Sequence, residues 1–528
     1  LISNMFAGSL AVSGNSTAVA TSGDLRLANV TNTGPMTLRA PSGSIDLGSA
    51  FITGGDLTLQ SRDDMNLGGA NITGNLNMSS TLGTVAFGQA TVTGSLTATT
   101  DHQTVDLGSA NVGGNLNVHS NGGNIVQSTA NGSFLQVAGT SQLNAGSGNV
   151  TLPNAPNQFG QAVSLQANVV VLMGSNGIIL GDSTVTGQMD VTAVTGNVTQ
   201  TPTGVVNVSG TSSLTAIHGD VIMGNANTFT QTVIVNAVNA TLNSTTALTL
   251  GASTVTGDLQ ATASTGDITQ TGPLVVTGTS NLVATAGNIT LIDTANSFGG
   301  RVSIDTPQAL QLTTSGPLSM GEVNVGLTTN LQSHGVLDMG TSSVYMGKLK
   351  VNSGGFDIIQ SGPMKAGADE DFDAGTAKID LFNPKNLWLG ALYFKGGIIM
   401  INHPQLLNAV NSGVLMERAE ISLATPVAVP AVQTSAVTGG ASTVSVVVNR
   451  SPSATQTGVI QVQVAPEAAS AGKSFSFELD PHAVAGHAAD APLKISQMDG
   501  KPMPNWLKFD AATKTFTAKD VPASAFPL

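Results

Sequence analysis

Apolar and polar residues alternate along the first 125 residues, and the alternation repeats every twenty positions. One apolar position recurs at this spacing, and a second apolar position follows each of them after two residues. The first column is Leu25, Ile45, Met65, Val85, Val105 and Ile125, and the second is Leu27, Leu47, Leu67, Phe87 and Leu107. Apolar residues at i and i+2 are typical of a β-strand with one buried face. The pattern therefore predicts short strands separated by turns.

A short, fixed period of strand and turn predicts a solenoid. Units such as "MNLGGANITGNLNM" (65–78) and "VDLGSANVGGNLNV" (105–118) contain no helical stretch. We interpret each unit as one coil of a right-handed parallel β-helix, in which equivalent residues stack about 4.8 Å apart. Glycine is expected at a turn with positive φ, and alanine at a tight inner corner. These recurring positions are Gly48, Gly68, Gly88 and Gly108, and Ala50, Ala70, Ala90 and Ala110.

A longer period follows residue 125. The stretch "STVTGQMDVTAVTGNVTQT", which begins at Ser183, returns as "STVTGDLQATASTGDITQT" from Ser253, 70 residues later. An Asn-x-Phe motif recurs at nearly the same spacing, with its asparagine at Asn157, Asn227 and Asn296. We expect three coils to form one duplicated block. Apolar markers continue to about Ile398, which predicts roughly 18 coils and a rod roughly 85–90 Å long.

The composition changes near residue 380, and we divide the chain into four regions. Residues 1–380 are predicted to form the β-helix, 381–423 a cap over its last coil, 424–441 a Pro/Ala/Thr-rich linker and 442–528 a small β-sandwich. Trp388 is expected in the core of the cap and Trp506 in the core of the sandwich. We interpret the sandwich as incomplete, because the sequence ends where another strand is expected. The chain begins without an initiator Met or a signal peptide, and we interpret it as an internal piece of a longer precursor.

Composition narrows the class of function. Charged residues make up 9% of the chain, against about 25% in typical domains, and the formal net charge is −13. The first 150 residues hold three basic side chains, Arg26, Arg39 and Arg62, so no basic stripe offers a nucleic-acid surface. The absence of cysteine excludes disulfides, thiolate metal sites and cysteine nucleophiles. The sequence contains no apolar run of about 20 residues, so it predicts no transmembrane helix.

Candidate catalytic groups are sparse. A β-helical glycoside hydrolase needs two carboxylates about 5–9.5 Å apart. Asp46 and Asp106 share one register, but Asn66 and Ala86 lie between them, so we interpret both carboxylates as solvated strand residues. The sequence has no nucleophile elbow and no phosphate loop, and its seven histidines are scattered. We therefore predict no catalytic residue, no cofactor and no enzymatic activity.

The densest acidic stretch, "AGADEDFDAG", offers one weak metal candidate. Its carboxylates are Asp369, Glu370, Asp371 and Asp373. Hard oxygen ligands at short spacing suit Ca²⁺. The spacing matches neither an EF-hand nor the glycine-rich nonapeptide, so a solvated loop is the favoured interpretation. His482 and His487, five residues apart, are a weaker candidate still.

The coils resemble the haemagglutinin-type repeats of filamentous-haemagglutinin-like large exoproteins, the two-partner-secretion adhesins of Gram-negative bacteria. The resemblance lies in the "LGSAxITG" units, the block "TGDITQTGPLVVTGTSNLVATAGNITL" (265–291) and segments such as "NSFGGRVSI" (296–304), and it covers roughly residues 1–400. The segment "MDGKPMPNWLKFDAATKTFTA" (498–518) is similar to immunoglobulin/cadherin-like domains of such proteins. The N-terminal secretion domain that defines the family is missing from this sequence.

The resemblance implies a secreted protein at the bacterial cell surface, exported through an outer-membrane pore partner. It implies a non-enzymatic adhesin or matrix protein that acts in attachment, aggregation or biofilm formation, with surface glycans or proteins as partners and with self-association as a further option. A subunit of a homopolymeric filament or sheath is the first alternative. A β-helical carbohydrate-active enzyme is the second, and we disfavour it because no carboxylate pair supports it.

Overall fold

The computed structural model describes residues 5–20, 22–127 and 132–401, and short stretches beyond them. The short stretches are 419–421, 445–450, 459–463, 475–478, 493–496, 503–510, 512–513 and 515–519. The regular elements within these residues are β-strands, without a helix. Among them, accordingly, no helix is long and apolar enough to cross a membrane.

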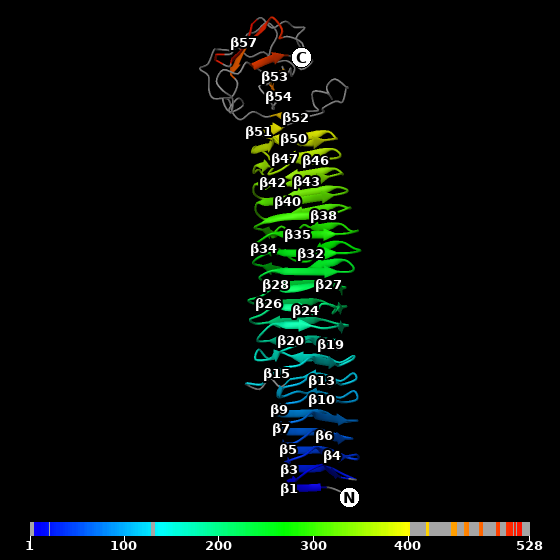
Figure 1. Cartoon of the computed structure of the whole chain (residues 1–528). Helices are drawn as coiled ribbons and strands as arrows, with labels where there is room; N and C mark the ends of the chain where they lie inside the picture. Colours follow the sequence, from blue (N-terminus) through cyan, green and yellow to red (C-terminus); the bar gives the residue numbers. More distant parts are fainter. Residues whose placement is uncertain are drawn as a thin grey trace. The chain divides into compact units, whose positions relative to one another are not determined.

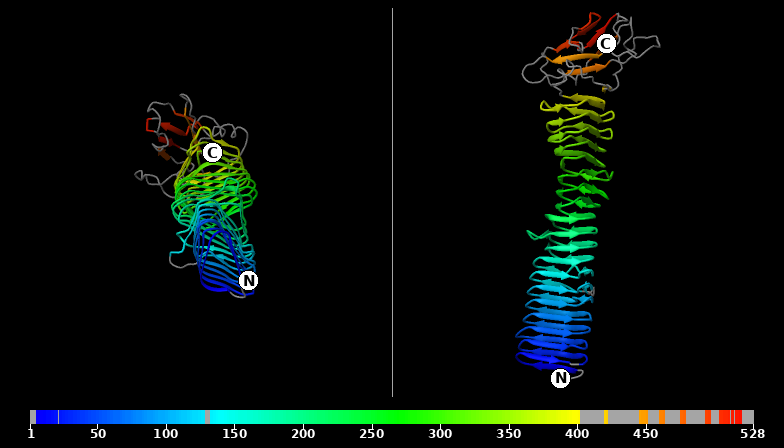
Figure 2. Two further views of the ribbon diagram at one scale, coloured as in Figure 1. Left: turned by 60° about the horizontal axis from the view of Figure 1, so that its bottom comes forward. Right: turned by 90° about the vertical axis from the view of Figure 1, so that its right-hand side faces the viewer.

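The chain divides into unit 1, residues 1–318 with 324–326, and unit 2, residues 319–323 with 327–528. The parallel strands described in each unit form turns of a β-solenoid, about 19 in all among the described residues, which confirms the predicted parallel β-helix. In unit 1 the turns follow one another along a single axis (Figures 1 and 2). Stacking satisfies the backbone groups of each short strand and buries an apolar face that one coil alone could not bury.

The uniform coils of unit 1 keep the twenty-residue step in their first sheet. Each of the first five contributes an eight-residue strand to this sheet and a shorter strand to a second sheet, and the next coil contributes two short strands in place of the long one. Every strand pairs in parallel with its equivalent one coil away. The first sheet contains β1 (Met5–Val12), β3 (Leu25–Asn32), β5 (Ile45–Ile52), β7 (Met65–Ile72), β9 (Val85–Val92), β11 (Val105–Asp106) and β12 (Ser109–Val112). The second contains β2 (Ser16–Val19), β4 (Met36–Ala40), β6 (Leu57–Ser61), β8 (Leu76–Ser80), β10 (Leu96–Thr99) and β13 (Leu116–His119).

Both predicted apolar columns are buried, from Leu25 to Ile125 and from Leu27 to Leu107. Inward and outward positions alternate along each strand, but the alternation shifts where the long strand turns a corner, so that β3 has two consecutive exposed residues. Glycine holds this corner for a different reason than predicted. Only Gly108 of this column has a positive φ, whereas a Cβ on Gly68 would lie 2.5 Å from the carbonyl oxygen of Gly48. Close stacking of backbones, and not backbone handedness, requires glycine at Gly68.

The block coils begin near residue 125 and vary in length. One strand of the 70-residue block shows how the blocks are arranged: it is β16 (Ser141–Asn144) in the first block, β26 (Ser212–Ala216) in the second and β35 (Ser280–Ala284) in the third. β16 and β35 lie in the second sheet, but β26 lies in the first. Successive blocks therefore present the same strand on alternate sheets. A block is about three and a half coils, which corrects the prediction of three.

The solenoid turns of unit 2 extend beyond the predicted boundary at residue 380. β47 (Glu370–Asp373) pairs in parallel with β44 (Leu349–Asn352) and with β50 (Leu392–Gly396). β49 (Leu387–Trp388) pairs with β46 (Met364–Ala366), and β51 (Ile398–Ile401) pairs with β48 (Lys378–Leu381). Residues 381–401, which we predicted as a cap, thus form further parallel coil. Trp388 is buried there and meets the ring of Phe372 edge-on at 6.2 Å.

The C-terminal region contributes two antiparallel sheets of three strands each. One has the order β54 (Val459–Gln463), β53 (Ser445–Arg450) and β56 (Leu493–Ser496), and the other β55 (Phe475–Glu478), β58 (Thr515–Ala518) and β57 (Leu507–Asp510). Trp506 is half-buried beside the second sheet. A sandwich of these sheets stays a prediction, and the predicted linker lies outside the described residues.

Candidate functional site

The predicted calcium ligands do not converge. Along β47 the side chains alternate, so Glu370 points into the coil while Asp371 and Asp373 point outward. Asp373 pairs with Lys395, with 3.1 Å between Oδ2 and Nζ, and Asp369 accepts a hydrogen bond from the Ala391 amide at 3.2 Å. Among the described residues, no three His, Asp or Glu side chains are grouped to hold a metal ion.

Glu370 is instead a buried acid in a core column, between Leu349 and Leu392. Its Oε1 accepts one long hydrogen bond from the Ala368 amide at 3.4 Å, and its Oε2 has no hydrogen-bond partner. Burial raises the pKa of this carboxyl to about 8. Tyr345, at the end of β43 (Ser342–Tyr345), is also fully buried, and burial and the charges of Asp338 and Glu370 raise its pKa above the usual range. The interior of unit 2 therefore favours an uncharged Glu370.

Asn386, two residues before Trp388, marks a fourth block, and the position of Glu370 recurs in each block. It lies sixteen residues before Asn386, and three serines lie fifteen or sixteen residues before the asparagines of the other blocks. All four side chains are buried, and each has an oxygen atom without a hydrogen-bond partner: Ser141 Oγ, Ser212 Oγ, Ser280 Oγ and Glu370 Oε2. The three hydroxyls are small enough for the core, whereas the fourth block places a carboxyl there.

Each block also contains a pair of side-chain amides whose asparagine is buried. In the third block, Asn296 Nδ2 donates to Gln270 Oε1 at 2.9 Å, and Gln270 Nε2 donates back to Asn296 Oδ1 at 2.9 Å. Asn296 Oδ1 also accepts from the Leu274 amide at 2.8 Å. Asn296 is fully buried, so these bonds satisfy groups that water cannot reach.

The same amide pair occurs in all four blocks. The pairs are Gln127 with Asn157, Gln200 with Asn227, Gln270 with Asn296, and Gln360 with Asn386. In each, the asparagine Oδ1 also accepts from one backbone amide on a neighbouring turn, that of Leu135, Val206, Leu274 or Met364. The amide pair therefore ties two coils together at one register.

The sequence signal for this pair was visible only in part. The Asn-x-Phe motif showed that the asparagine recurs, but not that it is buried or that a glutamine 26–30 residues earlier binds it. The fourth copy, Asn386-Leu387-Trp388, has Trp in place of Phe and lies 90 residues after Asn296, and the cap interpretation concealed it. A search for Gln and Asn at this separation finds all four.

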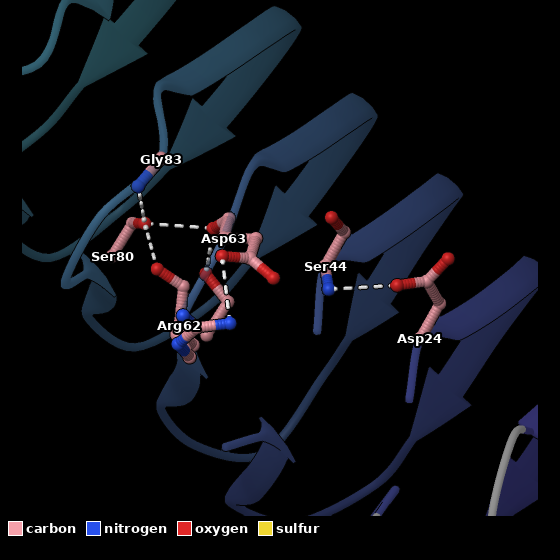
Figure 3. A network of polar contacts seen from close by, with 7 residues as sticks. Asp24, Ser44, Arg62, Asp63, Ser80 and Gly83 are labelled. Atoms are coloured by element: carbon pink, nitrogen blue, oxygen red, sulfur yellow. Dashed lines mark hydrogen bonds and ion pairs between the residues drawn. The ribbon is translucent and has the colours of Figure 1, made fainter. Parts of the chain in front are cut away.

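A second set of side chains links successive turns at the surface. The carboxylate of Asp24 accepts from the Ser44 amide at 3.0 Å, one coil further on (Figure 3). The backbone hydrogen bond from Ser44 lowers the pKa of Asp24. Further along unit 1, Asp220 accepts from the Asn239 amide at 3.0 Å, and Asn239 Oδ1 accepts from the Asp258 amide at 2.8 Å. A neutral residue separates the two carboxylates in this column, which limits repulsion between like charges.

Hydroxyl side chains close the neighbouring turns. Ser80 Oγ donates to the Asp63 carbonyl at 2.7 Å and accepts from the Gly83 amide at 3.0 Å (Figure 3). Arg62 and Asp63 form an exposed ion pair beside them, with 3.6 Å between Nη1 and Oδ1. The Ser80 side chain therefore binds backbone groups of its own coil and of the preceding coil.

The remaining sequence candidates lie apart. Asp46 and Asp106 are three coils from each other, about 14 Å at the usual strand spacing, which exceeds the separation that a hydrolase needs. Asp46 accepts from Asn66 Nδ2 at 3.3 Å. His102 is exposed beside Asp101, with 2.8 Å between Nδ1 and Oδ1. His482 and His487 lie outside the described residues.

A comparison with protein families reproduces the blocks. A family described as "Repeats of unknown function (DUF5649)" matches residues 93–166, 167–236, 237–305 and 324–394. Each matched stretch contains one complete Gln–Asn pair, and the gap of 306–323 has about the length of one coil. No curated protein and no solved structure matches the chain.

Proposed function

Because the four matches cover more than half of its length, the chain belongs to this family of repeats of unknown function, and we propose that it is a non-enzymatic extracellular adhesin or matrix protein. In this proposal the β-helix is a stiff element at a cell surface that promotes attachment, aggregation or biofilm formation. Export through an outer-membrane pore partner and a location at the bacterial surface belong to the same proposal, and the sequence resemblance supports them.

One observation supports aggregation in particular: the same repeat surface occurs on both sheets of unit 1. Thr184 lies on the outer side of β22 (Ser183–Val185) in the second sheet. Its equivalent in the next block, Thr254, lies on the outer side of β31 (Ser253–Val255) in the first sheet. Both threonines are exposed. A partner that recognises one block can therefore bind on either side, which allows one chain to bridge two partners.

The charge pattern limits the kind of partner. No lysine or arginine lies between Arg62 and Arg301, and ten aspartates occur in that interval. Such a surface repels anionic lipid and nucleic acid. It also repels a second copy of itself, which favours neutral glycans or proteins over self-association along this interval.

A display assay tests the proposed function. The chain is presented on a bacterium that does not adhere, and settling of the culture is followed with and without an excess of the soluble chain; cells that carry the anchor alone are the control. We expect clumping that the soluble chain blocks. Absence of clumping would contradict the adhesin role and favour the filament or sheath alternative. Release of reducing sugar from polysaccharides by the soluble chain would favour the carbohydrate-active enzyme instead.

A further inference from the structure

We propose that the outer side of β3, β5, β7, β9 and β12 is a binding face for neutral polysaccharide. The inference rests on the proposed adhesin function and identifies a surface and a ligand class for it. We call this surface the amide–hydroxyl face. It comprises the outward residues after the corner of each long strand, two per coil over five coils, among them Asn29, Ser49, Phe51, Asn71, Gln89 and Thr91.

Regular spacing is the first property of this face. The five strands pair in register, so Thr31, Phe51 and Asn71 form one column, which Thr91 and Asn111 continue. Neighbouring rows lie about 4.8 Å apart, and the two residues of one row about 7 Å apart. This arrangement repeats a position along the direction in which the coils stack, and eight of its ten residues carry a carboxamide or a hydroxyl.

Hydrogen-bonding capacity is the second property. Carboxamide and hydroxyl groups both donate and accept hydrogen bonds, as the hydroxyl groups of a sugar do. Part of this capacity is used within the face, because Ser49 Oγ donates to Asn29 Oδ1 at 2.6 Å. Asn71, Gln89 and Thr91 are exposed and available to a ligand in solvent.

An aromatic side chain is the third property. Phe51 is 48% exposed, although aromatic residues make up only 4% of the chain. A single exposed apolar residue is ordinary by itself. This one lies within a strand, among polar neighbours, and diagonally across from Gly69, whose added Cβ would have no atom closer than 3.8 Å. The ring and the open place beside it offer an apolar platform with room for a sugar ring.

Absence of charge decides between ligand classes. The face as defined contains no ionisable side chain, so it has no group that pairs with a sulfated or carboxylated glycan. A protein partner needs a buried centre rich in aromatic residues, and this face has one large apolar side chain. The chemistry therefore fits a neutral polymer of hydroxyl groups, bound weakly at each coil and repeatedly along the face.

Affinity electrophoresis of the soluble chain tests the proposal. Native gels contain a soluble β-glucan, a mannan, dextran, heparin or no polysaccharide. We expect slower migration in at least one neutral gel, equal at low and high salt, and no effect of heparin. The variant Phe51→Ala should bind about tenfold more weakly. Leu82→Ala, which removes a 52% exposed side chain from a turn, is the matched control and should bind as the parent chain does.

Other outcomes overturn the proposal in distinguishable ways. Unchanged migration in every neutral gel would refute neutral polysaccharide as the ligand. Equal affinity of Phe51→Ala and the parent chain would refute this face as the binding site. Retardation by heparin alone points to an anionic ligand, and a concentration-dependent shift in the blank gel points to a second copy of the chain. Since Phe51 is exposed, the variant should keep the parent's far-ultraviolet circular dichroism. Clumping in the display assay without any retardation would leave the adhesin role intact and refute only this face.

Discussion

The uniform coils and the block coils use different side chains to hold successive coils together. In the uniform coils the long strands step by twenty residues, and like residues stack in apolar columns such as the one through Leu25, Ile45 and Met65. In the block coils the steps vary, and a Gln–Asn pair with a buried asparagine recurs once per block. An apolar column holds many contacts of similar strength, whereas an amide pair is satisfied in one register only. In coils of unequal length, the repeat alone does not fix the register between successive coils. The Gln–Asn pair supplies a directional interaction there.

Removal of the amide pair should have the largest effect on this comparison. In Asn296→Ala, the Leu274 amide and the half-buried Gln270 side chain lose their partner, and the site of Asn296 is buried. We expect the free energy of unfolding to fall by about 4 kcal/mol, because each unsatisfied buried group costs about 1–3 kcal/mol. Urea unfolding followed by circular dichroism measures it. The double variant with Gln270→Leu and Asn296→Leu should recover part of the loss, and a loss as large as in the single variant would contradict the explanation.

Glu370 should make the stability of unit 2 depend on pH. Its folded-state pKa of about 8 lies above the ordinary value of 4.5, so the folded chain keeps a proton that the unfolded chain releases. Between these two pH values the contribution of Glu370 to stability should fall by about 1.4 kcal/mol per pH unit, and above pH 8 it should level off. Glu370→Gln removes the titration. Urea midpoints from pH 5 to pH 9 should therefore diverge between parent and variant as pH rises, and parallel curves would contradict a buried acid.

Two adjacent glycines of the uniform coils offer a matched pair. A Cβ at Gly68 would lie 2.5 Å from the Gly48 carbonyl oxygen, whereas a Cβ at Gly69 meets nothing closer than 3.8 Å. We expect Gly68→Ala to destabilise the chain by about 2 kcal/mol, because overpacking forces backbones apart. Gly69→Ala should change stability little. Equal effects in thermal unfolding would show that the corner does not depend on close backbone stacking.

The unpaired hydroxyls of the blocks should give the smallest effect, with the opposite sign. Ser212 Oγ is buried and lacks a hydrogen-bond partner, so Ser212→Ala removes an unsatisfied polar atom. We expect a gain of about 1 kcal/mol in the free energy of unfolding. Ser213→Ala, at the neighbouring outward position, is the control and should be neutral. Destabilisation by Ser212→Ala would indicate a partner that this account lacks.

Periodicity made the uniform coils predictable from the sequence. A constant step places equivalent residues in columns, and the residues predicted for the columns, such as Val85 and Leu107, are buried. The predicted reason for glycine at Gly68, a positive φ, was wrong, because a pattern along the chain does not reveal contact with the neighbouring coil. Only the stacked structure brings these two backbones together.

The block coils were predictable only to the level of their period. A 70-residue repeat does not reveal that a block is three and a half coils long, since this depends on which sheet each strand joins. The acidic stretch shows a similar limit. Composition placed Asp369, Glu370, Asp371 and Asp373 together as possible ligands, but strand alternation sends Glu370 inward and its neighbours outward. The amide–hydroxyl face was likewise not located from the sequence, because its residues share one surface only through the strand register.

Hydrogen exchange at four backbone amides tests the role of the amide pairs most directly. The amides of Leu135, Val206, Leu274 and Met364 each donate to the buried asparagine of their block. If the pair fixes the register of the block coils, these four amides should be among the slowest to exchange in their coils, and Asn296→Ala should accelerate Leu274 selectively. Exchange at the rate of exposed turn amides in the parent chain would contradict the claim that the Gln–Asn pair holds successive coils in register.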